Sequence, residues 1–258
     1  MNVAYANIQS TTSNLTLANW WDHILARCAV NRSGHRVEPG LYALGNPTPE
    51  SPVLVTANYT LSFDSLRASL TGYDAYILIL DTQGINVWCA AGKGTFGTDE
   101  LVHRIEQTGL KDIVTHRTLI LPQLGAPGVA AHEVKKRSQF KVEYGPVRAS
   151  DLPHYLQTYS TTPEMRRVNF PLLDRITLIP VELVFVLIPL LLVAVVLRSI
   201  PGVVSILAGV VLFPIILPWL PTPNLSTKGF ILGWIVIFPF ALGTFFRHPE
   251  TAWGINSL

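Results

Sequence analysis

Apolar residues follow two different patterns along this chain. Between residues 51 and 165, short apolar runs alternate with polar stretches, whereas residues 176–246 are almost continuously apolar. Buried strands separated by helices produce the first pattern, and helices that cross a membrane produce the second. We therefore predict a helical and turn-rich lead-in over residues 1–50, an α/β domain over 51–165 and a transmembrane domain over 166–258.

The α/β domain is predicted to alternate between strands and helices. The expected strands are Val53–Ala57, Ala75–Leu80, Thr118–Leu121 and Phe140–Tyr144. Helices are expected near residues 17–28, over 62–70, from an N-cap at Thr98 to a terminating Gly109, and over 129–137. Strands separated by helices imply parallel pairing with right-handed crossovers. The predicted fold is therefore Rossmann-like, with a parallel sheet followed by transmembrane α-helices.

Three apolar stretches are long enough to be predicted as membrane spans, at about residues 176–197, 203–220 and 229–246. Their prolines are compatible with a bilayer, where neighbouring helices satisfy the freed carbonyls. Basic residues on one side of the spans (Arg166, Arg167, Arg175, Lys228) outnumber those on the other (Arg198, Arg247). This imbalance predicts a multi-pass protein of the cytoplasmic (inner) membrane whose N-terminal domain faces the cytoplasm. Glu182, inside the first span, is either functional or close enough to the end of the span to reach the interface.

Composition narrows the classes of partner and site. The chain has 258 residues, 49% of them hydrophobic, and a mean hydropathy of +0.35, which is too apolar for one soluble domain. A net charge of +2 without a basic run predicts no nucleic-acid partner. Two cysteines, Cys28 and Cys89, are too few for a Cys-rich zinc or iron–sulfur site built from this chain alone. Cys28 lies in an amphipathic helical pattern and is expected to pack rather than bind.

The loops that follow the predicted strands are the candidate binding site, because ligands bind beyond the carboxyl ends of the strands in such sheets. Small residues dominate these loops, and they suit either a large planar ligand or ordinary tight turns. The loops are Thr56–Thr60, Gly84–Thr95, Gln123–Gly128 and the pair Gly145 and Pro146.

Cys89 is the most informative residue in these loops. It follows an apolar strand and has small neighbours, so its thiol can act as a ligand or a nucleophile; a lone cysteine of this kind can also simply pack in the core. A nucleotide site is less favoured. Gly92–Gly97 matches G-x-G-x-x-G but does not follow its strand directly, and Lys93 lacks the neighbours of a P-loop lysine.

The run from Asn86 to Lys93, NVWCAAGK, resembles the signature of the HgcA family of mercury-methylation corrinoid proteins. Other runs resemble the same family, and the likeness extends over about residues 36–246. These runs are residues 39–45, 53–59, 121–132 and 144–149. The corrinoid-binding domain of the corrinoid iron–sulfur protein is similar at the level of the fold but lacks this Trp-Cys pair. The family usually carries five spans rather than three, which leaves a C-terminal truncation open.

The resemblance implies a corrinoid-dependent methyltransferase that passes a methyl group from a cobalamin-type cobalt corrinoid to mercuric ion, giving methylmercury. Cys89 would be the catalytic residue and the lower axial ligand of cobalt, and its soft thiolate would weaken the carbon–cobalt bond on the opposite face. The corrinoid would also contact residues of all four loops. These are Thr56, Ala57, Asn58, Tyr59, Asn86, Val87, Trp88, Ala90, Ala91, Gly92, Lys93, Gly125, Ala126, Pro127, Gly145 and Pro146.

The same resemblance implies partners that this chain does not contain. Cobalt must be reduced between cycles, which implies a ferredoxin-like protein with two 4Fe–4S clusters. The methyl donor is expected to come from the methyl-tetrahydrofolate pathway, and membrane lipid would surround the spans. Two alternatives stay open: a corrinoid methyl carrier that serves another acceptor, and a membrane-tethered binding or sensor module.

Overall fold

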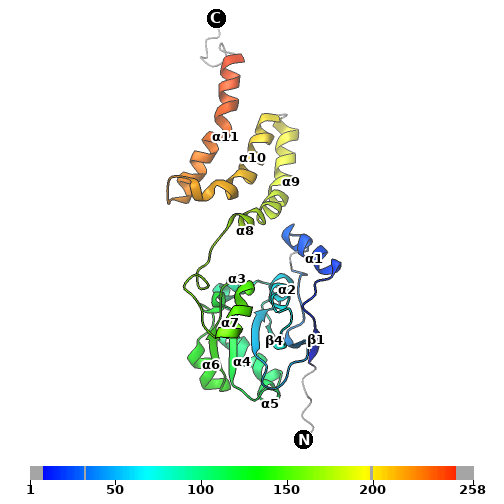
Figure 1. The fold of residues 1–258 in the computed structure, drawn as a ribbon. Helices are drawn as coiled ribbons and strands as arrows, with labels where there is room; N and C mark the ends of the chain where they lie inside the picture. Colours follow the sequence, from blue (N-terminus) through cyan, green and yellow to red (C-terminus); the bar gives the residue numbers. More distant parts are fainter. Residues whose placement is uncertain (1–7, 32, 198–199, 248–258) are drawn as a thin grey trace, which may run out of the picture. The chain divides into compact units, whose positions relative to one another are not determined.

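The computed structural model describes residues 8–31, 33–197 and 200–247, and the chain divides into two compact units (Figure 1). The first unit comprises residues 1–26 and 30–168 and contains a six-stranded sheet with helices on both faces. The second comprises residues 27–29 and 169–258 and is helical in its described part.

The sheet of the first unit has the strand order β1-β2-β4-β3-β5-β6. Strands β3, β4, β5 and β6 are mutually parallel where they pair, whereas β2 runs antiparallel to β4 and β1 parallel to β2. The strand bounds are β1 Gln9–Thr11, β2 Gly40–Leu44, β3 Val53–Ala57, β4 Ala75–Leu80, β5 Thr118–Leu121 and β6 Lys141–Tyr144. The predicted α/β fold with a mostly parallel sheet is therefore confirmed.

Two strands were missed from the sequence. Gly40–Leu44 lies between Pro39 and Gly45, two residues that are typical of turns, and β1 has only three residues. Both lie on one side of the parallel core of the sheet, where β2 covers the edge of β4. An antiparallel strand added to the edge of a parallel sheet is common in such folds.

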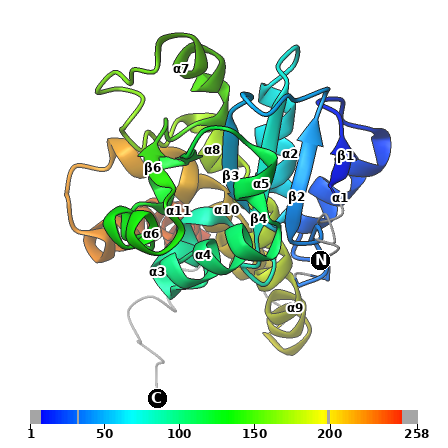
Figure 2. The ribbon, with the colours of Figure 1, turned by 90° about the horizontal axis from the view of Figure 1, so that it is seen from below.

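Helices cover both faces of the sheet because successive strand residues point in opposite directions. Val53, Val55 and Ala57 pack with α3, α4 and α6, and Figure 2 shows α4 and α6 side by side. Leu54, on the other face, packs with α2 and α7. The bounds are α1 Leu17–Arg27, α2 Thr60–Ser69, α3 Val87–Lys93, α4 Thr98–Gln107, α5 Leu110–Ile113, η1 Gln123–Gly125, α6 Ala131–Ser138, η2 Ala149–Asp151 and α7 Leu152–Thr158.

The ends of α4 match the prediction only at the carboxyl end. Gly109 adopts φ 59°, as expected of a glycine that ends a helix, directly after the C-cap Thr108. The N-cap, however, is Gly97 rather than Thr98. The hydroxyl of Thr98 accepts a hydrogen bond from the Ala130 amide at 2.8 Å, so it ties α4 to the segment before α6 instead of capping its own helix.

Strand β3 lies between β4 and β5, and this position determines where a ligand can bind. The chain leaves β3 toward β4 on one side and later returns to β5 on the other. Neighbouring crossovers therefore diverge beyond the carboxyl ends of β3 and β5. Such a topological switch point is where ligands bind in open α/β sheets.

Helix α1 is attached to the first unit through buried charged side chains. His23 Nε2 lies 2.8 Å from Asp64 Oδ2, and Arg67 Nε donates to Asp64 Oδ1 at 2.7 Å. Arg67 Nη1 also donates to the carbonyls of Thr12 and Asn14. Because all three side chains are buried, these hydrogen bonds fix α1 and the preceding segment on α2.

A second histidine makes this attachment sensitive to pH. His35 Nδ1 lies 2.7 Å from Asp22 Oδ1, and His35 Nε2 lies 2.7 Å from the Val30 carbonyl. Both ring nitrogens face acceptors, so the doubly protonated ring satisfies both. Burial alone would lower the pKa of His35, but the hydrogen bonds to Asp22 and Val30 and the charge of Asp22 raise it above its ordinary value. Burial acts to raise the pKa of Asp22, but hydrogen bonds from Thr60 and His35 lower it overall.

We expect α1 to be held less firmly above neutral pH. Because the pKa of His35 is higher in the folded than in the unfolded chain, its contribution to stability is fully present below the unfolded-state pKa of about 6.5. This contribution is lost as the pH rises through the folded-state pKa. The lowered Asp22 pKa gives stability that is lost only as pH falls through its folded value, below about 3.9. Hydrogen exchange of the α1 amides should therefore be faster at pH 8.5 than at pH 6, after correction for the intrinsic rate. His35→Gln should remove this dependence, and an equal pH response in that variant would contradict the assignment.

The second unit consists of α8 Leu172–Ile176, α9 Ile179–Leu197, α10 Ile200–Ile216, η3 Leu217–Trp219 and α11 Leu225–Arg247. Over the described residues, none of these helices combines the length and the apolar character needed to cross a membrane. The prediction of a multi-pass protein of the cytoplasmic membrane is therefore wrong.

The first two predicted spans do not coincide with single α-helices. The first predicted span includes residues 176–178, which precede α9, and the second includes η3, which is not α-helical. Helix α10 has 17 residues, a rise of about 26 Å, against the roughly 30 Å of a bilayer core. Arg198, used to predict the orientation, lies outside the described residues.

Candidate functional site

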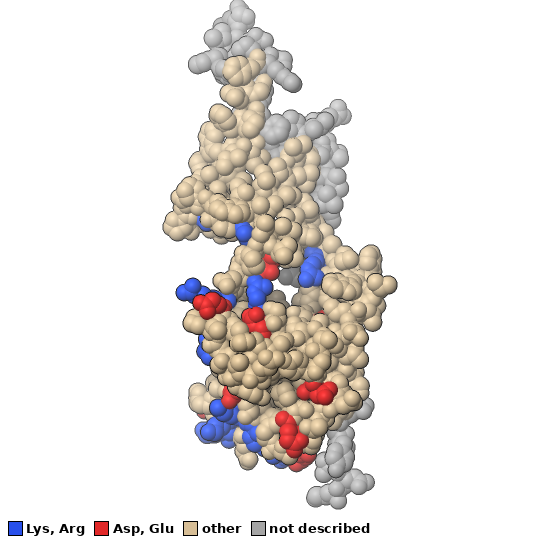
Figure 3. Space-filling view, viewed as in Figure 1, with Lys and Arg blue, Asp and Glu red and all other residues tan. Residues whose placement is uncertain are grey.

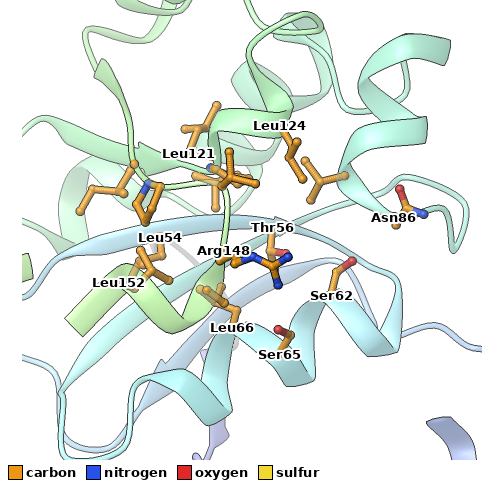
Figure 4. A pocket seen from close by; sticks show the side chains of 18 of the residues that line it. Leu54, Thr56, Ser62, Ser65, Leu66, Asn86, Leu121, Leu124, Arg148 and Leu152 are labelled. Carbon is orange, nitrogen blue, oxygen red and sulfur yellow. The ribbon is translucent and has the colours of Figure 1, made fainter. Parts of the chain in front are cut away.

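A cavity of about 370 Å³ lies at the switch point of the sheet (Figure 4). The ends of β3 and β5 form its floor, through Thr56 and Leu121 among others. The first turns of α2 and α3 and the segment after β6 form its walls. The lining residues are Leu54, Val55, Thr56, Leu61, Ser62, Ser65, Leu66, Asn86, Val87, Trp88, Ile120, Leu121, Pro122, Leu124, Gly145, Pro146, Val147, Arg148, Ala149 and Leu152.

The cavity brings together residues from all four predicted loops. Thr56 reaches it from the end of β3, and Gly145 and Pro146 reach it from the segment after β6. Asn86, Val87 and Trp88 contribute from the start of α3. The fourth loop contributes none of its predicted residues, although Leu124 of the same loop lines the cavity.

The cysteine segment is a helix rather than the predicted turn. Asn86 is its N-cap, and the side-chain Oδ1 of Asn86 accepts a hydrogen bond from the Cys89 amide at 3.0 Å. Gly94 ends the helix with φ 84°, a left-handed conformation that glycine adopts without strain. An N-cap asparagine and a terminating glycine eight residues later are helix signals that the sequence already contained.

Helix α3 is amphipathic in its packing, and this decides where the thiol lies. Val87, Ala90 and Ala91 are buried in the core under the sheet. Trp88 and Cys89 lie on the opposite, exposed face, where 58% of Trp88 is accessible to solvent. Cys89 is a free thiol that does not belong to the core, so the packing alternative for this residue is not supported. Cys28, at the end of α1, is free and half-buried.

Asn58 has a supporting role in the site. Its side-chain Oδ1 accepts hydrogen bonds from the Thr82 amide, the Thr82 hydroxyl and the Gly84 amide. Its Nδ2 donates to Asp81 at 3.1 Å. The amide thus joins the end of β3 to the loop that leads into α3. Asn58 positions that loop through its side-chain oxygen and one of its two amide N–H groups.

The other residues predicted to contact the corrinoid differ in their exposure to solvent. Ala57 and Gly125 are buried with Ala90 and Ala91, so they shape the site from within. Tyr59 and Ala126 are half-buried, and Gly92, Lys93 and Pro127 are exposed. None of these residues lines the cavity.

Several lining residues were missed from the sequence. Ser62, Ser65 and Leu66 come from the first two turns of α2, and Figure 4 shows Arg148 reaching into the cavity from the segment after β6. The i, i+3, i+4 spacing of the three α2 residues places them on one helix face. That spacing was visible in the sequence, but the prediction considered only loops.

The cap of α3 gives a direct test of how Cys89 is held. Asn86→Ala removes the acceptor for the Cys89 amide and should lower the stability of the domain by about 1 kcal/mol, whereas Asn86→Asp keeps an acceptor and should cost much less. Urea unfolding of the three proteins, followed by hydrogen exchange at Cys89, measures both effects. Equal exchange in Asn86→Ala and Asn86→Asp would show that the cap does not hold this turn.

Comparison with known proteins gives a consistent family. The family model described as "CO dehydrogenase/acetyl-CoA synthase delta subunit" matches residues 28–156, half of the chain. The acetyl-CoA decarbonylase/synthase complex subunit gamma of Methanopyrus kandleri is 34% identical over 128 residues, which cover 49% of this chain and 27% of the relative. The gamma subunit of Methanothermobacter thermautotrophicus is 29% identical over 171 residues, covering 58% of this chain and 37% of the relative.

The matched region contains the sheet from β2 onward, α3 and the cavity at the switch point. The chain spans about a quarter to somewhat more than a third of the length of these relatives. The family model nevertheless covers the part of the chain in which the candidate site lies. The chain belongs to the CO dehydrogenase/acetyl-CoA synthase delta subunit family.

Proposed function

We propose that this protein is a corrinoid-binding methyl carrier in which Cys89 is the lower axial ligand of cobalt. The observation that carries the proposal is the position of Cys89, a free and exposed thiol in the first turn of a capped helix. The residues just before it line the cavity at the switch point of the sheet. Axial ligation requires a thiol that is both accessible and held in place.

The available protein ligands suit a metal ion that is already bound by a macrocycle. Over the described residues, no group of three or more His, Cys, Asp or Glu side chains is placed to hold a metal ion. A single thiolate is a poor site for a free ion but a sufficient protein ligand for cobalt whose other positions are filled by a corrin ring. The cavity, at 370 Å³, is at the small end of ligand pockets, so it would hold one side of the corrinoid while the rest extends over exposed α3.

The chain's own residues would bind and orient the corrinoid. Trp88 offers an exposed apolar surface beside the thiol, and the polar ends of Thr56, Ser62 and Ser65 are available to amide substituents of the ring. Lys93, exposed at the end of α3, is one turn from Cys89 and can reach a polar substituent. When bound, the corrinoid supplies a cobalt centre that accepts and releases a methyl group.

The proposal also specifies which molecule accepts the methyl group. The matched relatives are subunits of acetyl-CoA decarbonylase/synthase complexes, and this favours a methyl carrier that works with other proteins. The run Asn86–Lys93 resembles the signature of the mercury-methylation family, and on this resemblance we propose mercuric ion as an acceptor. A ferredoxin-like protein with two 4Fe–4S clusters as reductant and a donor from the methyl-tetrahydrofolate pathway belong to the same proposal.

A reconstitution experiment separates the carrier from its acceptor. The full chain is loaded with methylcobinamide, a corrinoid without its own lower base, and the optical spectrum is compared with that of the free corrinoid. Ligation by the protein predicts a shifted spectrum, and an unchanged spectrum contradicts the carrier. Mercuric ion is then added and methylmercury is measured. A shifted spectrum with no gain in rate over the free corrinoid would leave the carrier supported and overturn mercury as acceptor.

A further inference from the structure

The helical unit contains a second cavity, of about 660 Å³, formed by side chains from α8, α9, α10, η3 and α11. Its wall is mostly aliphatic and aromatic, including Leu178, Val210, Phe213, Leu232 and Val236. Figure 3 shows few charged side chains on the face of this unit that it draws. The two charged residues that line the cavity, Arg175 and Glu182, are therefore informative.

Arg175 is buried but only partly satisfied. Only 7% of the residue is exposed. Its Nη1 donates to the Ile215 carbonyl at 2.8 Å, and its guanidinium lies 5.4 Å from the centre of the Trp219 ring. The Nε atom is buried without a hydrogen-bond partner. None of the ion pairs found over the described residues includes Arg175.

The unused part of the guanidinium indicates the kind of group that would complete it. Arginine binds a carboxylate through two parallel N–H donors, and one such pair is Nε with Nη2. In Arg175 the other nitrogen, Nη1, is already held by the last turn of α10. A buried donor without a partner is costly, so an oxyanion at this edge would relieve that cost.

Three glycines leave space for the rest of such a ligand. Gly209, Gly229 and Gly233 line the cavity, and a Cβ atom added to any of them would meet no atom of the described residues within 4 Å. The wall is thus open next to α10 and α11. A cavity of this volume suits one ligand of moderate size with a largely apolar body.

We infer that this cavity binds a single-chain amphiphile with a carboxylate head, the head on Arg175 and the alkyl chain along the glycine-lined wall. Glu182 lines the same cavity. Its negative charge disfavours a dianionic head, so a carboxylate is expected to bind more tightly than a phosphate monoester of the same chain.

Binding of cis-parinaric acid to the full chain, kept in a nonionic detergent, tests the inference by fluorescence. The acid should bind about tenfold more tightly than its methyl ester, which corresponds to roughly 1.4 kcal/mol for the charged head. Arg175→Gln should lower the affinity for the acid to that for the ester. Gly233→Leu fills the wall without a backbone clash and should abolish binding of both probes. Gly243→Leu, on the same helix but outside the cavity, is the matched control and should bind as the wild type does.

The possible outcomes test two claims separately: that Arg175 binds the carboxylate head, and that the cavity binds the alkyl chain. Equal affinity for acid and ester in the wild type would overturn the role of Arg175. Unchanged binding in Gly233→Leu, or loss of binding in Gly243→Leu, would overturn the cavity as the binding site. If Arg175→Gln fails to fold, judged by circular dichroism, the acid-to-ester ratio and the two glycine variants still give a decision. A phosphate monoester of the same chain that binds more tightly than the carboxylate would contradict the role given to Glu182.

Discussion

Cys89→Ala should abolish sulfur ligation and reduce methyl transfer by at least about a hundredfold. Misplacing a reacting group by about 1 Å already costs on that order, and this substitution removes the group entirely. Because Cys89 is exposed and its side chain packs in no core cluster, the stability of the domain should change little. The rate of methyl transfer from the loaded protein and the urea midpoint of the apoprotein measure the two effects separately.

The matched control is Cys28→Ser, which removes the other free thiol of the chain. Cys28 is half-buried after α1, so this variant should keep both ligation and transfer. A loss of transfer in Cys28→Ser as large as that in Cys89→Ala, in a folded protein, would refute the assignment. Retention of transfer in Cys89→Ala would refute it more directly.

Gly128→Ala should destabilise the domain and disturb the site together. A Cβ atom at Gly128 would collide with the backbone carbonyl oxygen of Phe96 and would lie 3.0 Å from Ala91 Cα. Neither atom belongs to a flexible side chain, so α3 or the loop that carries Gly128 must move. Overpacking of this kind costs about 1–3 kcal/mol, and a shift of α3 displaces Cys89 on its other face. The urea concentration at the midpoint of unfolding and the affinity for the corrinoid should both be lower than in the wild type.

Gly92→Ala is the matched control because it adds the same methyl group to α3 on its exposed side. A Cβ atom at Gly92 meets nothing within 4 Å, and replacing a helical glycine by alanine stabilises by about 0.5–1 kcal/mol. Stability should therefore rise slightly, while any loss of corrinoid affinity would report contact of the ring with this face. Equal stability of the two variants would show that the close approach of Gly128 to α3 has no energetic role.

Much of the α/β unit could be predicted from the sequence. The strands β3, β4 and β5 are largely buried apolar runs bounded by polar segments, whereas β6 buries only Val142. The separation of these strands by helices favours parallel pairing. Strand β2 was missed because its five residues lie between turn-forming neighbours, and pairing with β1 and β4 stabilises them as a strand. That information is tertiary and is not local to the segment.

The site was predicted in outline and not in detail. The order of strands and helices placed Thr56, Trp88 and Gly145 at one edge of the sheet, and the structure brings all three to one cavity. The spacing of the α2 residues shows that they share one helix face, but which face meets the cavity, and that Arg148 reaches it, depends on tertiary packing. The assignment of Asn58 to ligand binding was natural from its position at a strand end. Its four hydrogen bonds, which the sequence does not reveal, show that it also joins the end of β3 to the loop before α3.

The membrane prediction failed for a reason of a different kind. Mean hydropathy is a property of a stretch of sequence, whereas crossing a bilayer requires one continuous helix of sufficient length. In the first two predicted spans, residues 176–178 and η3 added apolar residues without adding to α9 or α10, whereas the third predicted span lies within α11. Some apolar residues of this unit, such as Phe213 and Leu232, line a cavity.

X-ray absorption at the cobalt edge tests the central claim most directly, because it reports the atoms bound to cobalt whatever the activity. The corrinoid-loaded wild-type protein should show one sulfur neighbour of cobalt, and that neighbour should be absent in Cys89→Ala and present in Cys28→Ser. Cobalt surrounded only by nitrogen and oxygen in the wild-type protein, or a sulfur neighbour that persists in Cys89→Ala, would contradict the assignment of Cys89 as the axial ligand.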